Sequence, residues 1–386
     1  MSQTVFKLSS YIRPADVTHF IVDTTMEDFD LSEYTKIKCI EYKCNNIPVL
    51  NGISRVKRVI INNIARNMKN LVKADHYVIS AKLLHHPVFK NASTLEIIGD
   101  KNNIVLDNID HDNFPNLIGL KLTSVIVDLD LLKDISKIIR LATLEFDLCP
   151  GLDKFDWSTV CQDKFTHLIG LKIKSVHITL ALINNISNIK TLVSLHFKSC
   201  GVRVSSWDNL DLPKLHIFFA DVEFDDVLFL EKCPYLTMLT MELADECKNL
   251  SVFSKLPLRY LNVSDKRPKL VLGNDIEMLY LHSLCGNLDC TNMAQLKMFR
   301  FTNDPNNSYN RLNIASNVVQ IHSKLDGELL KNNQSLWIKA YQSMLNSIMN
   351  TNRINMSVQP DKAEAVTKID ELQKQIDQLK QSFAKN

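Results

Sequence analysis

Glycine is scarce in this chain, which has 9 glycines among 386 residues. Loops that cradle phosphate groups depend on glycine, because only glycine lets the backbone approach a ligand so closely. The sequence contains no Walker loop, no glycine-rich dinucleotide turn and no G-x-S-x-G nucleophile turn. We therefore expect no enzymatic activity and no cofactor.

Long apolar runs and paired cysteines are also missing. No stretch approaches the roughly 18 consecutive apolar residues that a membrane-spanning helix needs. The nine cysteines are scattered and form no C-x-x-C pair, which favours reduced thiols over disulfides or a zinc site. His85 and His86 are adjacent, and the acidic residues around His111 lack the spacing of a calcium loop. We expect a soluble cytoplasmic protein, with the nucleus as the alternative, and no metal.

Net charge of either sign is nearly absent. The chain has 45 Lys and Arg against 43 Asp and Glu, so its formal net charge is +2. A protein that holds nucleic acid over its whole surface is strongly basic, and this chain is not. Any basic surface must therefore be local.

Repetition is what the sequence does contain. "LIGLKLTSV" begins at Leu117 and "LIGLKIKSV" begins at Leu168, 51 residues later, and residues 114–150 align with residues 165–201 without a gap. A shorter frame, L-x-x-L-x-L with Ile, Val or Phe allowed, occurs twice within each unit. Over the whole chain this frame begins at Val17, Ile37, Val56, Leu117, Leu141, Leu168, Leu192, Leu212, Leu236, Leu258, Ile276 and Leu296, with weaker matches near Ala74, Ala92 and Val318.

The spacing between neighbouring starts, 18 to 27 residues, predicts a stacked array. Frame and spacing together resemble the leucine-rich-repeat family, whose consensus is L-x-x-L-x-L-x-x-N/C-x-L. The resemblance implies an α/β solenoid with a parallel sheet on its concave side and a mixed helical and extended convex side. Cys149 and Cys200 occupy the ninth place in two repeats, while Val125 and Val176 occupy it elsewhere. This pattern is similar to an irregular, cysteine-containing, intracellular type of repeat.

The domain organisation follows from where the frame starts and stops. Residues 1–16 are expected to form an N-terminal cap, 17–325 the solenoid, 326–350 a capping helix and 351–361 a linker. Residues 362–386 show a heptad pattern of apolar residues, which predicts a short coiled coil. Its seam consists of Ile369, Leu372, Ile376, Leu379 and Phe383. Dimerisation, a solvated tail helix and docking to another helix are all open for this segment.

Function is expected on the outward-facing side of the strands. In a strand, alternate side chains point to opposite faces, so the third, fifth and seventh places of each frame are exposed when the leucines are buried. A basic part and an aromatic, methionine-containing part are predicted there, and both are candidates for binding a protein partner. The candidate residues are Lys172, Lys174, His196, Lys198, Lys214, His216, Phe218, Tyr260, Tyr280, His282, Met298 and Arg300.

The function that these residues favour is a non-enzymatic protein-interaction module or scaffold. Its partner would be an acidic segment or one anchored by apolar side chains. One alternative is RNA binding through the basic and aromatic positions, because rings stack bases and cations meet phosphates. A second is a substrate receptor of a ubiquitin ligase, although no adaptor-binding helical module precedes Val17. Lysines that are merely solvated are the simplest explanation of the basic part.

Overall fold

The computed structural model describes residues 17–22, 29–61, 68–99, 106, 109–110, 112–155, 157, 165–204, 206–264, 272–281, 288–290, 293–301, 312–313 and 319–322. The chain divides into two units, Met1–Ile321 and His322–Asn386. The first unit contains nearly all of the described residues. The predicted cap at residues 1–16, the capping helix, the linker and the coiled-coil seam lie outside them and stay predictions.

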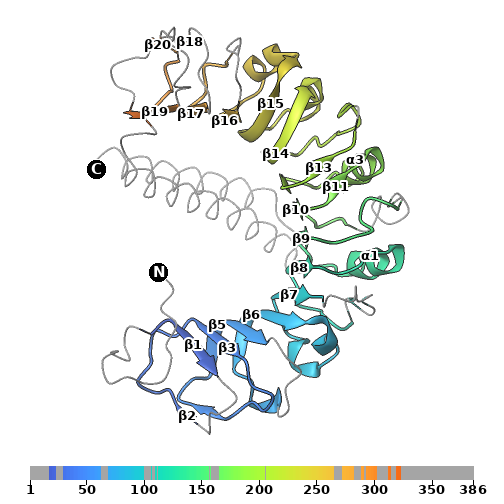
Figure 1. Cartoon of the computed structure of the whole chain (residues 1–386), viewed down its shortest axis with the longest axis vertical. Helices are drawn as coiled ribbons and strands as arrows, with labels where there is room; N and C mark the ends of the chain where they lie inside the picture. Colours follow the sequence, from blue (N-terminus) through green and yellow to red (C-terminus); the bar gives the residue numbers. More distant parts are fainter. Residues whose placement is uncertain are drawn as a thin grey trace, which may run out of the picture. The chain divides into compact units, whose positions relative to one another are not determined.

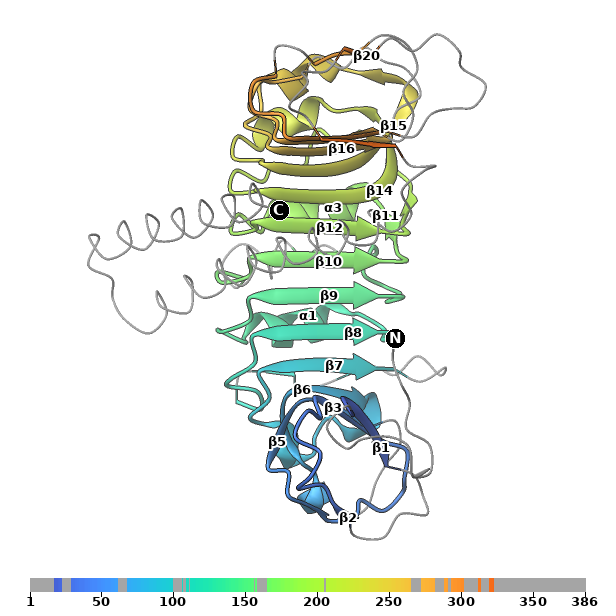
Figure 2. The same ribbon diagram turned by 90° about the vertical axis from the view of Figure 1, so that its left-hand side faces the viewer.

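A single parallel sheet of fifteen strands organises the first unit, and its strands follow the order of the chain (Figure 1). The strands are β1 (His19–Val22), β3 (Cys39–Tyr42), β5 (Arg55–Ile61), β6 (Lys73–Ser80), β7 (Thr94–Ile98), β8 (Gly119–Thr123), β9 (Thr143–Asp147), β10 (Gly170–Lys174), β12 (Ser194–Lys198), β14 (Ile217–Asp226), β15 (Met238–Lys248), β16 (Tyr260–Ser264), β17 (Met278–Leu281), β19 (Met298–Phe301) and β21 (Val319–His322). Each predicted repeat supplies one strand. Figure 2 shows the ladder face-on.

The remaining elements are short and connect successive strands. Two α-helices are described, α1 (Leu129–Ser136) and α3 (Leu180–Ser187), and Figure 1 shows both on the same side of the sheet. Three two-stranded ladders pair β2 (Phe29–Asp30) with β4 (Leu50–Asn51), β11 (His177–Ile178) with β13 (Gly201–Val202), and β18 (Leu288–Asp289) with β20 (Leu312–Asn313). The 3-10 turns are η2 (Met68–Asn70), η3 (Ala81–Leu83), η4 (Pro87–Phe89), η5 (Leu228–Lys232) and η6 (Leu250–Ser254). The convex side is thus mixed helical and extended within the described residues.

The leucines of the frame lie side by side, as the repeat predicts. Leu120 pairs in register with Leu144, Leu144 with Leu171, and Leu171 with Leu195. Each of these side chains is at most 3% exposed. One repeat cannot cover its own leucines, so stacking of neighbours is what buries this continuous core.

The backbone turns sharply after four consecutive strands, at the eighth place of the frame. Ser124, Leu148, Ser175 and Ser199 have φ between 53° and 55°, in the left-handed region. The amide of Leu148 donates to the carbonyl of Lys174 at 3.1 Å, and the amides of Ser124 and Ser175 donate to carbonyls of the next repeat in the same way. The amide of Ser199 donates instead to the carboxylate of Asp221 at 2.5 Å. At the ninth place, the thiol of Cys149 donates to the carbonyl of Leu122 at 3.4 Å, in the repeat before. This cysteine therefore links the turn after β9 to the backbone of β8.

Leu148 offers a test of the strain in this turn. A leucine in the left-handed region costs about 1–2 kcal/mol of conformational energy. Leu148 is 54% exposed, so burial of its side chain offsets little of this cost. Asparagine tolerates this conformation better. We expect Leu148→Asn to raise the free energy of unfolding by about 0.5–1 kcal/mol in urea titrations. Leu180→Asn, which removes a leucine of similar exposure from the start of α3, should give no such gain.

Helices α1 and α3 begin at capping side chains. Asp128 accepts from the amide of Leu131 at 2.8 Å, and Thr179 accepts from the amide of Leu182 at 3.3 Å. In α1, Leu132 and Ile135 are fully buried, as their helical spacing predicts. Ile139 continues the same apolar spacing in the sequence, but it is not part of the helix. The helix ends at Ser136, and Ile139 is 56% exposed beyond it.

One strand lies three residues further along the chain than its frame predicts. The frame at Leu212 places Leu215 in line with the neighbouring leucines, but the residue paired with Leu195 is Phe218. Phe218 is therefore buried, at 0% exposed, and its predicted place on the outward face is wrong. The actual frame begins at Leu215, with Ala220 as its third core residue. Phe219 and Asp221 consequently occupy the exposed fifth and seventh places.

Candidate functional site

The outward face is the side of the sheet that carries the third, fifth and seventh places of each frame. Its third places are small along β7 to β12: Thr94, Gly119, Thr143, Gly170 and Ser194. A Cβ on Gly119 would lie 3.0 Å from both Thr94 and Thr143, so this row has little room for larger side chains. The fifth and seventh places therefore supply the long polar side chains of this half.

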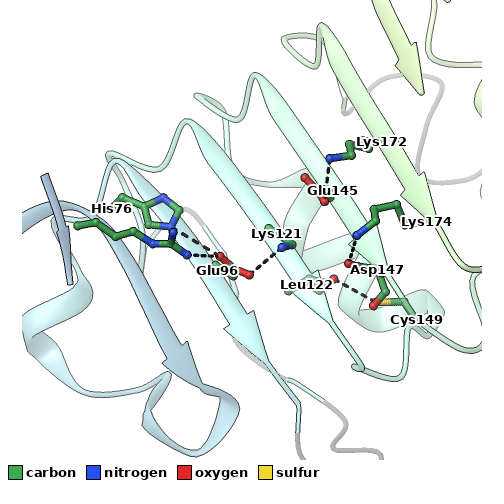
Figure 3. A network of polar contacts seen from close by, with 10 residues as sticks. His76, Glu96, Lys121, Leu122, Glu145, Asp147, Cys149, Lys172 and Lys174 are labelled. Atoms are coloured by element: carbon green, nitrogen blue, oxygen red, sulfur yellow. Dashed lines mark hydrogen bonds and ion pairs between the residues drawn. The ribbon is translucent and has the colours of Figure 1, made fainter. Parts of the chain in front are cut away.

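Charges alternate in sign along the fifth places and form a network (Figure 3). Glu96 on β7 is its centre, because a lysine, an arginine and a histidine ring surround it. Nζ of Lys121 lies 2.7 Å away, Nη2 of Arg58 3.2 Å and Nε2 of His76 3.8 Å from its carboxylate oxygens. The interaction with His76, together with Lys121 and Arg58, lowers the pKa of Glu96 to about 2 against the opposing effect of burial. Glu96 is thus ionised and paired at neutral pH.

The same alternation continues on β9 and β10. Nζ of Lys172 lies 3.1 Å from Glu145, and Nζ of Lys174 lies 2.5 Å from Asp147. The hydrogen bond to Asp147 raises the pKa of Lys174. Two lysines of the predicted basic part therefore have acidic partners one strand away. Together with Arg58, His76, Glu96 and Lys121, these four residues form what we call the charge network.

The two histidines of the predicted basic part contribute little positive charge. Burial, helped by Lys172, lowers the pKa of His196 to about 4, and its ring stacks on Phe219 with centroids 5.5 Å apart. Burial also lowers the pKa of His216, whose ring stacks on Tyr235 at 5.9 Å. Both rings are neutral at pH 7. His216 also precedes β14, as does Lys214, so neither stands at the outward place that the Leu212 frame assigned to it.

From β14 to β17 the third and fifth places carry no charge. Apart from Ile217, which is buried, the side chains there are partly exposed and form what we call the uncharged patch. Its members are Phe219, Met238, Thr240, Tyr260, Asn262, Met278 and Tyr280. Tyr260 and Tyr280 were predicted for this face, and Met238 and Met278 lie beside them. Phe219 was missed, because the frame at Leu212 placed its neighbour Phe218 outward.

The other predicted residues fall in three groups. Lys198 is exposed at the seventh place of β12, next to Lys174 on β10. Met298 and Arg300 lie on β19 in register with Met278 and Tyr280, and their side chains are outside the description. His282 lies outside the described residues.

Two negative findings apply to the described part of the chain. No three His, Cys, Asp or Glu side chains come together there in a way that could hold a metal ion. No helix in that part is long and apolar enough to cross a membrane.

Comparisons with known proteins find similarity in structure alone. No protein-family model and no curated protein sequence matches the chain. An internalin, inlF, from Listeria monocytogenes matches with a TM-score of 0.41 and 18% identity, over 80% of this chain and 87% of that one. TLR13, solved in complex with ssRNA13, matches with a TM-score of 0.50 and 13% identity, over 78% of this chain and 55% of that one.

The chain thus spans about half of the TLR13 chain that it matches. At this low identity the likeness bears on the fold and on nothing else. It agrees with the ladder of fifteen parallel strands, one for each sequence repeat, and with the buried rows of leucines. The chain has a leucine-rich-repeat type of fold.

Proposed function

We propose that this chain is a non-enzymatic interaction module that binds a protein partner on the outward face, with the uncharged patch as the main contact. The observation that carries the proposal is the continuity of that patch. Phe219, Met238 and Met278 are partly exposed on β14, β15 and β17, and no charged side chain separates them at the third and fifth places. Aromatic residues and methionine are enriched at the cores of protein interfaces, where charged residues are depleted.

The charge network supports the same location. Lysines with acidic partners on neighbouring strands offer little net attraction to a polyanion, and pairing fixes their side chains in place. Because these lysines are already paired, they attract an acidic protein segment only weakly as well. Apolar side chains of a partner can still bind the uncharged patch. TLR13 was solved with a single-stranded RNA, but a basic surface is what RNA requires, and the lysines Lys172 and Lys174 do not supply one here.

Other parts of the proposal rest on the sequence. The irregular, cysteine-containing repeat type, the cytoplasmic location and pairing or tethering through residues 362–386 belong to it. A receptor role in a ubiquitin ligase has no structural observation in its favour.

A capture experiment with the full chain tests the proposed function. The bait would be compared with the Phe219→Ser/Met238→Ser variant, using mass spectrometry to identify retained proteins from a cytoplasmic extract. Because anchors at the centre of an interface carry most of its energy, we expect at least one specific partner to be retained about tenfold less by the variant. Single-stranded RNA, titrated separately, should bind weakly and without dependence on the patch.

The matched control is Leu180→Ser/Leu228→Ser, which removes two exposed leucines from α3 and η5, away from the outward face. It should retain every partner of the unaltered chain. Equal loss in both variants would contradict the proposal, as would RNA binding that falls when Lys172 and Lys174 are reversed in charge.

A further inference from the structure

The ends of β14 and β15 are strongly acidic. These two strands contain seven Asp and Glu residues and one lysine, Lys248. On the outward face, Phe219 is followed at every second residue by Asp221, Glu223 and Asp225, while the inward residues Val222 and Phe224 are buried. On β15, Glu242 follows Thr240 in the same way. We call Asp221, Glu223, Asp225 and Glu242 the acidic edge.

A shift in register brings two of these carboxylates face to face. Phe219 pairs with Thr240, but two residues of β14 are then skipped, so that Glu223 pairs with Glu242. Neighbouring strands lie about 4.8 Å apart, and like charges directly opposite each other destabilise a sheet. Glu223, Asp225 and Glu242 are exposed, and no lysine or arginine of the described part forms an ion pair with them. The repulsion is therefore not relieved within that part of the chain.

The other half of the outward face shows that this chain can pair such charges. Glu96, Glu145 and Asp147 each have a lysine on the adjacent strand within 3.1 Å. The acidic edge lies at the same height or one step further along the strands, and it continues directly from the uncharged patch. Two residues of strand span about 6.6 Å, so Glu242 lies roughly 7 Å beyond Thr240 along β15. Glu223, which pairs with Glu242, lies at the same distance beyond Phe219, and Asp225 lies roughly two residues further.

We propose that the partner bound by the outward face is a protein segment that presents apolar side chains together with lysine or arginine. The apolar side chains contact the uncharged patch, and the cations meet the acidic edge, where they relieve the repulsion between Glu223 and Glu242. In an extended segment the cation follows the apolar anchor by two to four residues. Phosphate groups are repelled from the same edge. This inference rests on the proposed function and adds the chemistry of the partner.

The test is selection of peptides from a random 12-residue library displayed on phage, with the full chain as the target. Selected peptides are then synthesised, and their dissociation constants are measured by fluorescence anisotropy. We expect apolar residues with Lys or Arg two to four positions away to be enriched. Glu223→Lys/Glu242→Lys should weaken their binding about tenfold or more, and rising salt should weaken it further. Glu223→Gln/Glu242→Gln should give a smaller loss.

The matched control is Glu33→Lys/Asp130→Lys, which changes the net charge equally at two exposed positions on a turn and on α1. Its binding should stay within about twofold of the unaltered chain, since its charges lie far from the contact. Two results would overturn the partner chemistry and leave the proposed function standing. One is the selection of acidic peptides, and the other is peptides whose binding is weakened by Phe219→Ser but not by Glu223→Lys/Glu242→Lys. If neither Phe219→Ser nor the substitutions at Glu223 and Glu242 weakened binding of the selected peptides, both the partner chemistry and the proposed function would be overturned. The absence of any enriched peptide would have the same consequence.

Discussion

Phe218→Ala should lower the free energy of unfolding by about 3–5 kcal/mol, whereas Phe219→Ala should cost about 1 kcal/mol. The two residues are neighbours in sequence and identical in chemistry, so the difference comes from which face of β14 each one occupies. Phe218 is 0% exposed, and its ring centroid lies 6.2 Å from that of Phe197 and 6.0 Å from those of Phe224 and Phe229. Its removal leaves a cavity within an aromatic cluster that links two repeats.

Urea unfolding followed by circular dichroism would measure the two costs. Because a repeat array can unfold in parts, hydrogen exchange in β12, β14 and β15 should be recorded for each variant. We expect Phe218→Ala to speed hydrogen exchange in these strands. Phe219→Ala should leave the exchange rates almost unchanged. Similar costs for the two variants, or a larger one for Phe219→Ala, would contradict the register in which Phe218 pairs with Leu195.

The repeat architecture could be predicted because its signal is local and recurs. Each frame needs only two or three apolar residues at fixed spacing, and fifteen copies reinforce one another. The exception at β14 is instructive. Leu212, Leu215 and Ile217 are all buried, so the sequence from Leu212 fits the apolar frame. The frame nevertheless places the strand three residues too early. The choice between the registers depends on aromatic contacts of Phe218 with Phe224 and Phe229, which no six-residue frame contains.

The candidate site was harder to predict, because its charges act in pairs across strands. Lysines considered one by one suggested a basic surface. Their partners lie 25 to 27 residues away in sequence, as Lys121 does from Glu96 and Lys174 from Asp147. A signal was present, since the fifth places of consecutive frames alternate between Glu96, Lys121, Glu145 and Lys172. Comparison of equivalent places in neighbouring repeats would have revealed the pairing, whereas the low pKa of His196 depends on burial that sequence does not show.

The charge network also has a thermodynamic signature. Glu96 is 12% exposed, and its pKa falls from 4.5 to about 2 when the chain folds. A carboxyl group with a lowered folded-state pKa stabilises the protein fully above its unfolded pKa and loses this contribution as the pH falls through the folded one. We therefore expect Glu96 to contribute about 2–3 kcal/mol near neutral pH, declining between about pH 5 and pH 2.

Glu96→Gln tests this contribution. The variant keeps the size of the side chain but leaves Arg58 and Lys121 without their common acidic partner, so its free energy of unfolding at pH 7 should fall by about 2–3 kcal/mol. Urea titrations from pH 7 to pH 2.5 should show the difference between the unaltered chain and the variant shrinking steadily below pH 5. Glu33→Gln, at an exposed turn, serves as the control and should follow the unaltered chain throughout. A difference that stays constant over this range would mean that the loss comes from packing of the amide, and that the cations around Glu96 do not stabilise its charge.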